Sequence, residues 1–108
     1  MTEHNAAAME SLFQELREIG AVQSTSEFSI EWLGMQHSYL RCLRARNKRP
    51  STRAWATLAV KLRHASHVLA ANEQPKVRKS SKYLAKMADR CLEEIIAAGE
   101  RSQCVLSR

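Results

Sequence analysis

The chain has 108 residues and a net charge of +6, a size that accommodates one small domain with a single core. Its composition, with 44% apolar but only 6% aromatic residues, three glycines and two prolines, favours helices over strands. No apolar stretch approaches the ~20 residues that span a bilayer, and Met1–Ala8 lacks the basic and apolar regions of a secretory signal. We therefore expect a cytoplasmic protein with no membrane partner.

The charge is distributed unevenly along the chain. Residues 1–31 contain six acids and one base, residues 32–72 contain eight Lys or Arg and no acid, and residues 73–108 contain eight bases and five acids. A phosphate-binding surface explains the long acid-free segment, because a carboxylate there would repel a nucleic-acid backbone. A solvated basic face without a partner is the alternative.

Two amphipathic helices are predicted before residue 35. The first covers Ala6–Ile19 and ends at Gly20, which accommodates the left-handed C-cap conformation. Its apolar residues follow helical spacing: Met9, Leu12, Phe13, Leu16 and Ile19. The second helix covers Glu27–Leu33, after hydroxyl N-caps within Ser24–Ser26, and ends at Gly34.

A third and a fourth helix flank a basic loop. The third runs from Gln36 to about Ala45, with Leu40 and Leu43 on one side. Its other side is polar and carries His37, Ser38, Arg41, Cys42 and Arg44. Pro50 prevents its continuation, and Ser51 or Thr52 then caps the fourth helix, which fades near residue 72.

The last predicted helix covers Val77–Ala98 and ends at Gly99. Its length of about 33 Å is large for so small a protein. A heptad seam runs along it through Leu84, Ala88, Cys91 and Ile95, and Met87, Leu92 and Ile96 widen it. An apolar stripe of this length needs a cover. Either the helix lies across the core of its own chain, or it pairs with a second copy in a dimer.

The segment 24–63 resembles the Cro/repressor-type helix-turn-helix family, often called XRE-like. The residues that carry the resemblance are Leu33-Gly34, Met35, Leu40, Leu43, Pro50-Ser51 and Leu58-Ala59. The family has a small residue four positions before the turn glycine, where this chain has Ile30; a slight rotation of the helix would turn Ser29 inwards instead. The resemblance implies an all-α fold, a lambda-repressor-like helix-turn-helix domain of four to five helices with a long C-terminal helix. Residues 1–72 would form the DNA-binding domain, and residues 73–108 the C-terminal helix that packs or dimerises.

By the same resemblance, we expect the chain to be a sequence-specific regulator of transcription, such as a repressor, in the bacterial cytosol or nucleoid. Its partners would be double-stranded DNA and a second copy of itself. The residues that would read bases in the major groove are Gln36, His37, Ser38 and Arg41. The residues that would contact phosphates are Ser26, Tyr39, Arg44, Arg46, Lys48, Arg49 and Arg53. For Tyr39, packing beside the sugar-phosphate chain and covering the core remain equal alternatives.

Other functions fit the sequence less well. The cysteines Cys42, Cys91 and Cys104 match neither a zinc spacing nor a disulfide framework, and His64 and His67 lack a third ligand, so we expect no metal and no cofactor. No Gly-rich phosphate loop or nucleophile–base pairing is present, and we expect neither an enzyme nor a small-molecule substrate. The alternatives to DNA binding are a helical protein–protein interaction module that acts through its C-terminal helix, and binding of structured RNA.

Overall fold

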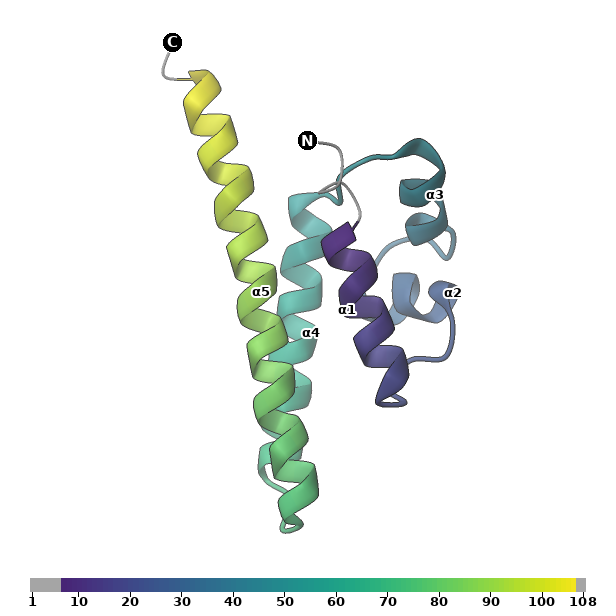
Figure 1. Cartoon of the computed structure of the whole chain (residues 1–108), viewed down its shortest axis with the longest axis vertical. Helices are drawn as coiled ribbons and strands as arrows, with labels where there is room; N and C mark the ends of the chain where they lie inside the picture. The colour runs from purple at the N-terminus through teal and green to yellow at the C-terminus, as the bar shows by residue number, and fades with distance from the viewer. Residues whose placement is uncertain (1–6, 107–108) are drawn as a thin grey trace. The chain divides into compact units, whose positions relative to one another are not determined.

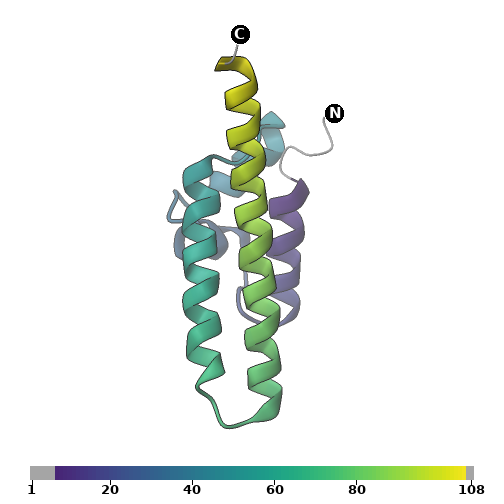
Figure 2. The same ribbon diagram turned by 90° about the vertical axis from the view of Figure 1, so that its left-hand side faces the viewer.

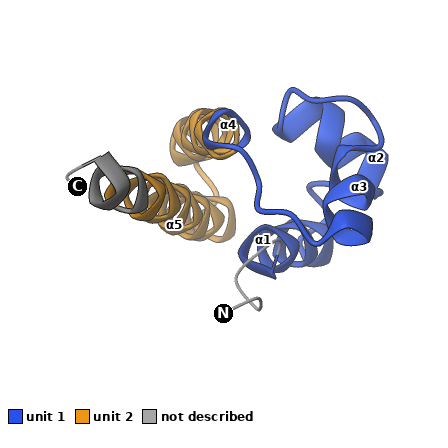
Figure 3. Cartoon of the chain, turned by 90° about the horizontal axis from the view of Figure 1, so that it is seen from above, with its two compact units in different colours: residues 1–54 blue, residues 55–108 orange. Residues whose placement is uncertain are grey.

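The computed structural model describes residues 7–106, and side chains are placed for residues 7–100. All regular structure in these residues is helical, as expected (Figure 1). The chain divides into two compact units, residues 1–54 and 55–108 (Figure 3). The boundary between the two units falls near the start of α4 (Thr52–Ala70). The sequence-based division instead lies between residues 72 and 73.

The first unit contains three helical segments before α4. They are α1 (Ala7–Glu18), α2 (Thr25–Glu27) continued by the π-helical turn η1 (Phe28–Trp32), and α3 (Tyr39–Arg46). The buried apolar side chains of this unit come from all three segments and the loops that join them: Met9, Leu12, Phe13, Leu16, Val22, Phe28, Leu33, Leu40 and Leu43. Among them, the rings of Phe13 and Phe28 contact each other in a tilted arrangement, with 5.3 Å between their centroids.

The helix ends in this unit follow local signals. Gly20 adopts a φ of 80°, and the N–H groups of Gly20 and Ala21 donate to the carbonyls of Arg17 and Leu16, which is a Schellman motif. The predicted C-cap of the first helix is therefore confirmed. At the start of α2, Ser24 Oγ accepts a hydrogen bond of 3.1 Å from the Glu27 N–H, as the hydroxyl cluster predicted.

The predicted bounds of the third helix were wrong at its start. The helix begins at Tyr39 and not at Gln36, since residues 36–38 form a turn in which the Tyr39 N–H donates to the Gln36 carbonyl. Asn47 ends α3 in the left-handed conformation, with a φ of 51°, and its N–H and that of Lys48 close a second Schellman motif. The helix thus ends at the Asn47 C-cap, three residues before Pro50.

The second unit is a helical hairpin. In it α4 and α5 (Pro75–Leu106) run antiparallel and side by side (Figure 2). Ser66 and Ser81 are buried where the helices meet, and each hydroxyl donates to the other residue's carbonyl at 2.8 Å. Small side chains with reciprocal hydrogen bonds allow the two backbones to approach without leaving a polar group unpaired. Nearer the other end of the hairpin, Arg63 pairs with Asp89 at 3.3 Å.

The heptad seam of the last helix is buried within a single chain as far as Cys91. Leu84, Met87, Ala88 and Cys91 are at most 3% exposed, whereas Leu92 and Ile96 are 41% and 61% exposed. The prediction that this helix ends at Gly99 was wrong. Only Gly20 and Gly34 have a positive φ among the described glycines, and α5 continues through Gly99 to Leu106. No helix among the described residues is long and apolar enough to cross a membrane.

Candidate nucleic-acid interface

The contact between α2–η1 and α3 is built around Ser29. This side chain is fully buried, whereas the neighbouring Ile30 is 51% exposed. Ser29 Oγ donates to the Thr25 carbonyl at 2.8 Å and accepts from the Leu40 N–H at 3.2 Å. Of the two arrangements that the sequence left open, the structure has the one with Ser29 facing inwards.

The π-helical turn accounts for this register. In η1 the Leu33 N–H donates to the carbonyl of Phe28, five residues earlier, so the turn holds one more residue than an α-helical turn. Gly34 follows with a φ of 64°, a conformation that costs glycine little, and the Met35 N–H donates to the Ser29 carbonyl at 2.9 Å. The turn glycine predicted from the sequence is therefore present.

Ser29 also completes the start of α3. Ser38 occupies the N-cap position of α3 but makes no capping hydrogen bond with its side chain. The Leu40 N–H, in the first turn of the helix, is instead bound by Ser29 from the preceding helical segment. Local sequence signals do not reveal this tertiary cap, because the two residues are 11 positions apart.

The exposed side of α3 carries one of the four predicted base-reading residues. Leu40 and Leu43 are buried and anchor the helix, while Arg41 is exposed. Gln36 and His37 lie in the turn before the helix, and Ser38 is half-buried at its N-cap. The structure therefore brings the four residues to one end of α3 without placing them all on it.

Exposed cations continue from α3 into the following loop. They are Arg41, Arg46, Lys48 and Arg49, none of which has an ion-pair partner within the part of the chain that the structure describes. Arg53, in the first turn of α4, is exposed as well. Since residues 32–72 contain no Asp or Glu, no carboxylate of the same segment neutralises these charges.

Arg44 is engaged inside the first unit. Its guanidinium grips the carboxylate of Glu10 with two hydrogen bonds, one of them from Nε to Oε2 at 2.8 Å, and it lies 6.0 Å from the ring centroid of Phe13. The hydrogen bond from Arg44 lowers the pKa of Glu10, and the same bond raises the pKa of Arg44. Of the residues predicted to contact phosphates, Arg44 thus already has an anionic partner, one that lies 34 positions away and that sequence reasoning missed.

Tyr39 ties α3 to the start of α4. Its hydroxyl oxygen accepts a hydrogen bond of 3.0 Å from the Ser51 N–H and lies 3.4 Å from Ser51 Oγ. Ser51 Oγ in turn accepts from the Ala54 N–H at 3.1 Å, so that Ser51, rather than Thr52, caps α4. Tyr39 therefore joins the end of the basic loop, at Ser51, to the start of α3. Ser26, the last predicted phosphate contact, is half-buried in α2.

Residues suited to other chemistry do not gather into a site. Within the described residues, no group of three His, Cys, Asp or Glu side chains is placed to hold a metal ion. His64 and His67 are both exposed on α4. Cys42 is exposed, whereas Cys91 is buried, and desolvation raises the pKa of its thiol to about 12.

The chain matches no curated protein and no solved structure. The resemblance to Cro/repressor-type proteins accordingly depends on the residues of segment 24–63 alone. A family does match, and it covers nearly the whole chain. Residues 9–105 match DUF6626, described as a family of unknown function, and the chain belongs to this family.

Proposed function

We propose that this protein binds double-stranded DNA in a sequence-specific manner and regulates transcription, with α3 in the major groove. The observation that supports the proposal best is the exposed basic surface formed by α3 and the loop after it, a segment whose own sequence contains no acid. A helix anchored by Leu40 and Leu43, with Arg41 on its free side, has the form of a recognition helix.

The residues fall into two roles. Arg41 is the candidate for a bidentate contact to guanine O6 and N7, and Gln36 and His37 would reach base edges from the turn that leads into α3. A second set would position the protein by neutralising phosphates, without reading sequence: Arg46, Lys48, Arg49 and Arg53. Arg44 and Tyr39 would act by holding α3 and the loop in place, through Glu10 and Ser51.

Binding to duplexes across a salt series tests the electrostatic part of the proposal. The four phosphate-binding cations should contribute about −3.6 to the slope of log K against log salt, at roughly −0.9 for each phosphate neutralised. Selection of duplexes from a random pool tests sequence specificity. A slope near zero, or a pool that yields no shared sequence, would contradict the proposal.

Two substitutions separate the two roles. Arg41→Ala should relax the preference at one base pair at a cost of roughly 1–3 kcal/mol, whereas Lys48→Ala should weaken binding to all duplexes alike. Arg17→Ala, at an exposed site on α1, is the control for the removal of one positive charge. If Arg41→Ala and Lys48→Ala have the same effect on every duplex, α3 does not read the groove.

The alternative is a protein–protein interaction module that acts through α5. The observation in its favour is the exposure of Leu92 and Ile96, which lie four residues apart on this helix and therefore on one side of it. Light scattering measures whether two copies of the chain associate, as pairing through this helix would require. A dimer that binds DNA should select two-fold-related half-sites separated by about 34 Å, one turn of DNA. A protein that binds no duplex at low salt would favour the interaction module.

A further inference from the structure

The charge at the start of α5 is opposite to the charge that stabilises a helix. The N-terminal end of a helix carries a partial positive charge and is stabilised by acidic side chains. The first turn of α5 contains no acid, and Lys76, Arg78 and Lys79 stand in or next to it. The helix would gain stability from acidic residues at these positions. A local departure of this kind is typical of sites that serve binding rather than folding.

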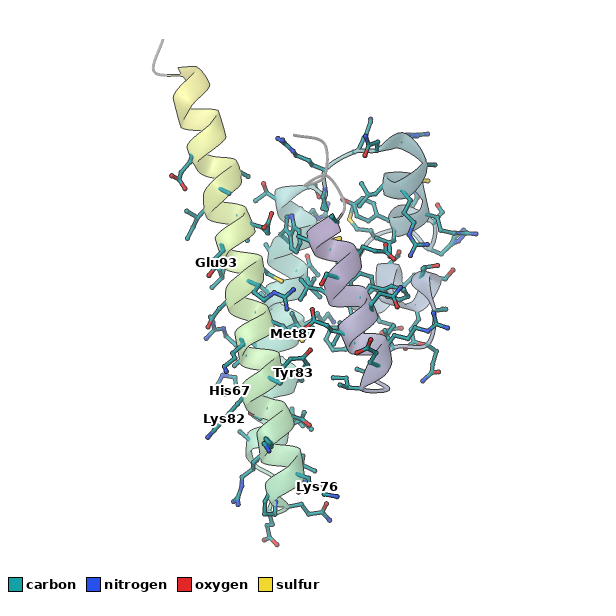
Figure 4. The ribbon with its side chains drawn as sticks, viewed as in Figure 1. His67, Lys76, Lys82, Tyr83, Met87 and Glu93 are labelled. Atoms are coloured by element: carbon teal, nitrogen blue, oxygen red, sulfur yellow. The ribbon has the colours of Figure 1, made fainter. Side chains whose placement is uncertain are left out.

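Cationic side chains surround a hollow at this place. Pro75, Arg78, Lys79 and Lys82 line a depression of about 330 Å³ in the second unit. Figure 4 shows that the side chains of Lys76 and Lys82 extend away from the ribbon of α5. All five residues are exposed. Arg78, Lys79 and Lys82 have no ion-pair partner among residues 7–100, for which side chains are placed.

One acid of the second unit lies two residues before α5, and the others lie further along the chain. Glu73 precedes α5, and the next acid along the chain is Asp89, which is paired with Arg63. Between them lie only basic and uncharged residues, the bases being Lys76, Arg78, Lys79, Lys82 and Lys86. The start of α5 thus forms a second cationic surface, in a different compact unit from the one that carries α3.

We propose that the hollow lined by Arg78, Lys79 and Lys82 binds phosphates of the duplex that α3 reads, and so acts as a second, sequence-independent clamp on the DNA backbone. This inference rests on the proposed function. A polyanion fits the surface because one phosphate both neutralises unpaired cations and relieves the unfavourable charge at the helix start. Two connected surfaces on one duplex bind more tightly than either alone, since the second contact becomes intramolecular.

The test compares two double variants of the full chain from which the same charge is removed. Arg78→Ala/Lys82→Ala removes two cations from the hollow, and Arg17→Ala/Lys61→Ala removes two exposed cations from α1 and α4. For the hollow variant, the slope of log K against log salt should become less negative by about 1.8, at roughly 0.9 for each phosphate that is no longer neutralised. For the control variant the slope should not change. The selected DNA sequence should be the same for both variants and the wild type.

A footprint gives an independent measurement. Hydroxyl-radical protection by the wild type should extend over flanking backbone that Arg78→Ala/Lys82→Ala leaves unprotected. Equal slopes for the two double variants, or an unchanged footprint, would overturn the clamp while leaving DNA binding by α3 intact. A wild type that binds no duplex would instead overturn the proposed function itself, and the clamp with it. Circular dichroism melting checks that both double variants remain folded.

Discussion

The replacement Ser29→Ala tests how the candidate recognition helix is held. Ser29 Oγ makes two hydrogen bonds, and its residue is fully buried. Alanine fills nearly the same volume but removes the oxygen. The Thr25 carbonyl still accepts from the Phe28 N–H, so it keeps a partner. The Leu40 N–H is deprived of its acceptor in a residue that is itself fully buried.

The magnitude follows from that single orphaned donor. A buried N–H left without a partner costs about 1–3 kcal/mol, and we expect a decrease of about 2 kcal/mol in the free energy of unfolding. For a chain of this size, such a decrease lowers Tm by about 8 °C. The first turn of α3 should also open more readily, because its second N–H is no longer capped.

Urea unfolding measures the stability, and amide hydrogen exchange measures the local opening. The matched control is Ser26→Ala, which alters a half-buried serine of the preceding helical turn, and it should change the stability by less than about 0.5 kcal/mol. In Ser29→Ala the Leu40 amide should exchange faster than in the control. If both variants are destabilised equally and the Leu40 amide keeps its protection, Ser29 does not cap α3.

Three further predictions concern charge and reactivity. Arg44 lowers the pKa of Glu10, so the ion pair stabilises the fold above the unfolded-state pKa of about 4.5, and this stabilisation is lost as the pH falls through the lower folded-state pKa. In urea unfolding between pH 6 and pH 3, the free energy of unfolding should therefore decrease more steeply for the wild type than for Arg44→Ala. Iodoacetamide should modify Cys42 in the native protein and should leave Cys91 unmodified until the protein unfolds, because Cys91 is buried and burial raises the pKa of its thiol to about 12. Equal labelling of the two cysteines in a peptide map of the native protein would contradict the burial of Cys91. Lys76→Glu should raise Tm by a few degrees, through a gain of about 0.3–1 kcal/mol in the free energy of unfolding at the start of α5. The same substitution should weaken DNA binding. A lower Tm in a melting curve would show that the positive charge there does not destabilise the helix.

Local features of the sequence predicted where most helices lie. Gly20 and Gly34 adopt positive φ values, as expected of residues without a Cβ, and Ser24 and Ser51 cap the helices that follow them. Each of these signals acts over three or four residues, so that both partners stand close together in the sequence. The segregation of charge along the chain is likewise a property of the sequence itself.

Other features depend on contacts between distant residues. Helical periodicity assumes 3.6 residues per turn, so it does not reveal the π-helical turn that brings Ser29, and not Ile30, to the start of α3. It also placed the start of α3 too early, because the polar residues 36–38 fit a helix as well as a turn. Gly99 carries the usual signal for a helix end, yet α5 passes through it.

In the candidate interface, too, some features follow from the local sequence and others from contacts between distant residues. Residues 32–72 are basic and free of acids by composition, and helical spacing places Leu40 and Leu43 on one side of a helix. Which of the cations remain available for binding depends on contacts that form when the chain folds. It joins Arg44 to Glu10 over 34 positions and leaves Arg41, Arg46, Lys48 and Arg49 exposed. An ion pair requires two side chains within about 4 Å, and folding, not spacing along the chain, brings them together.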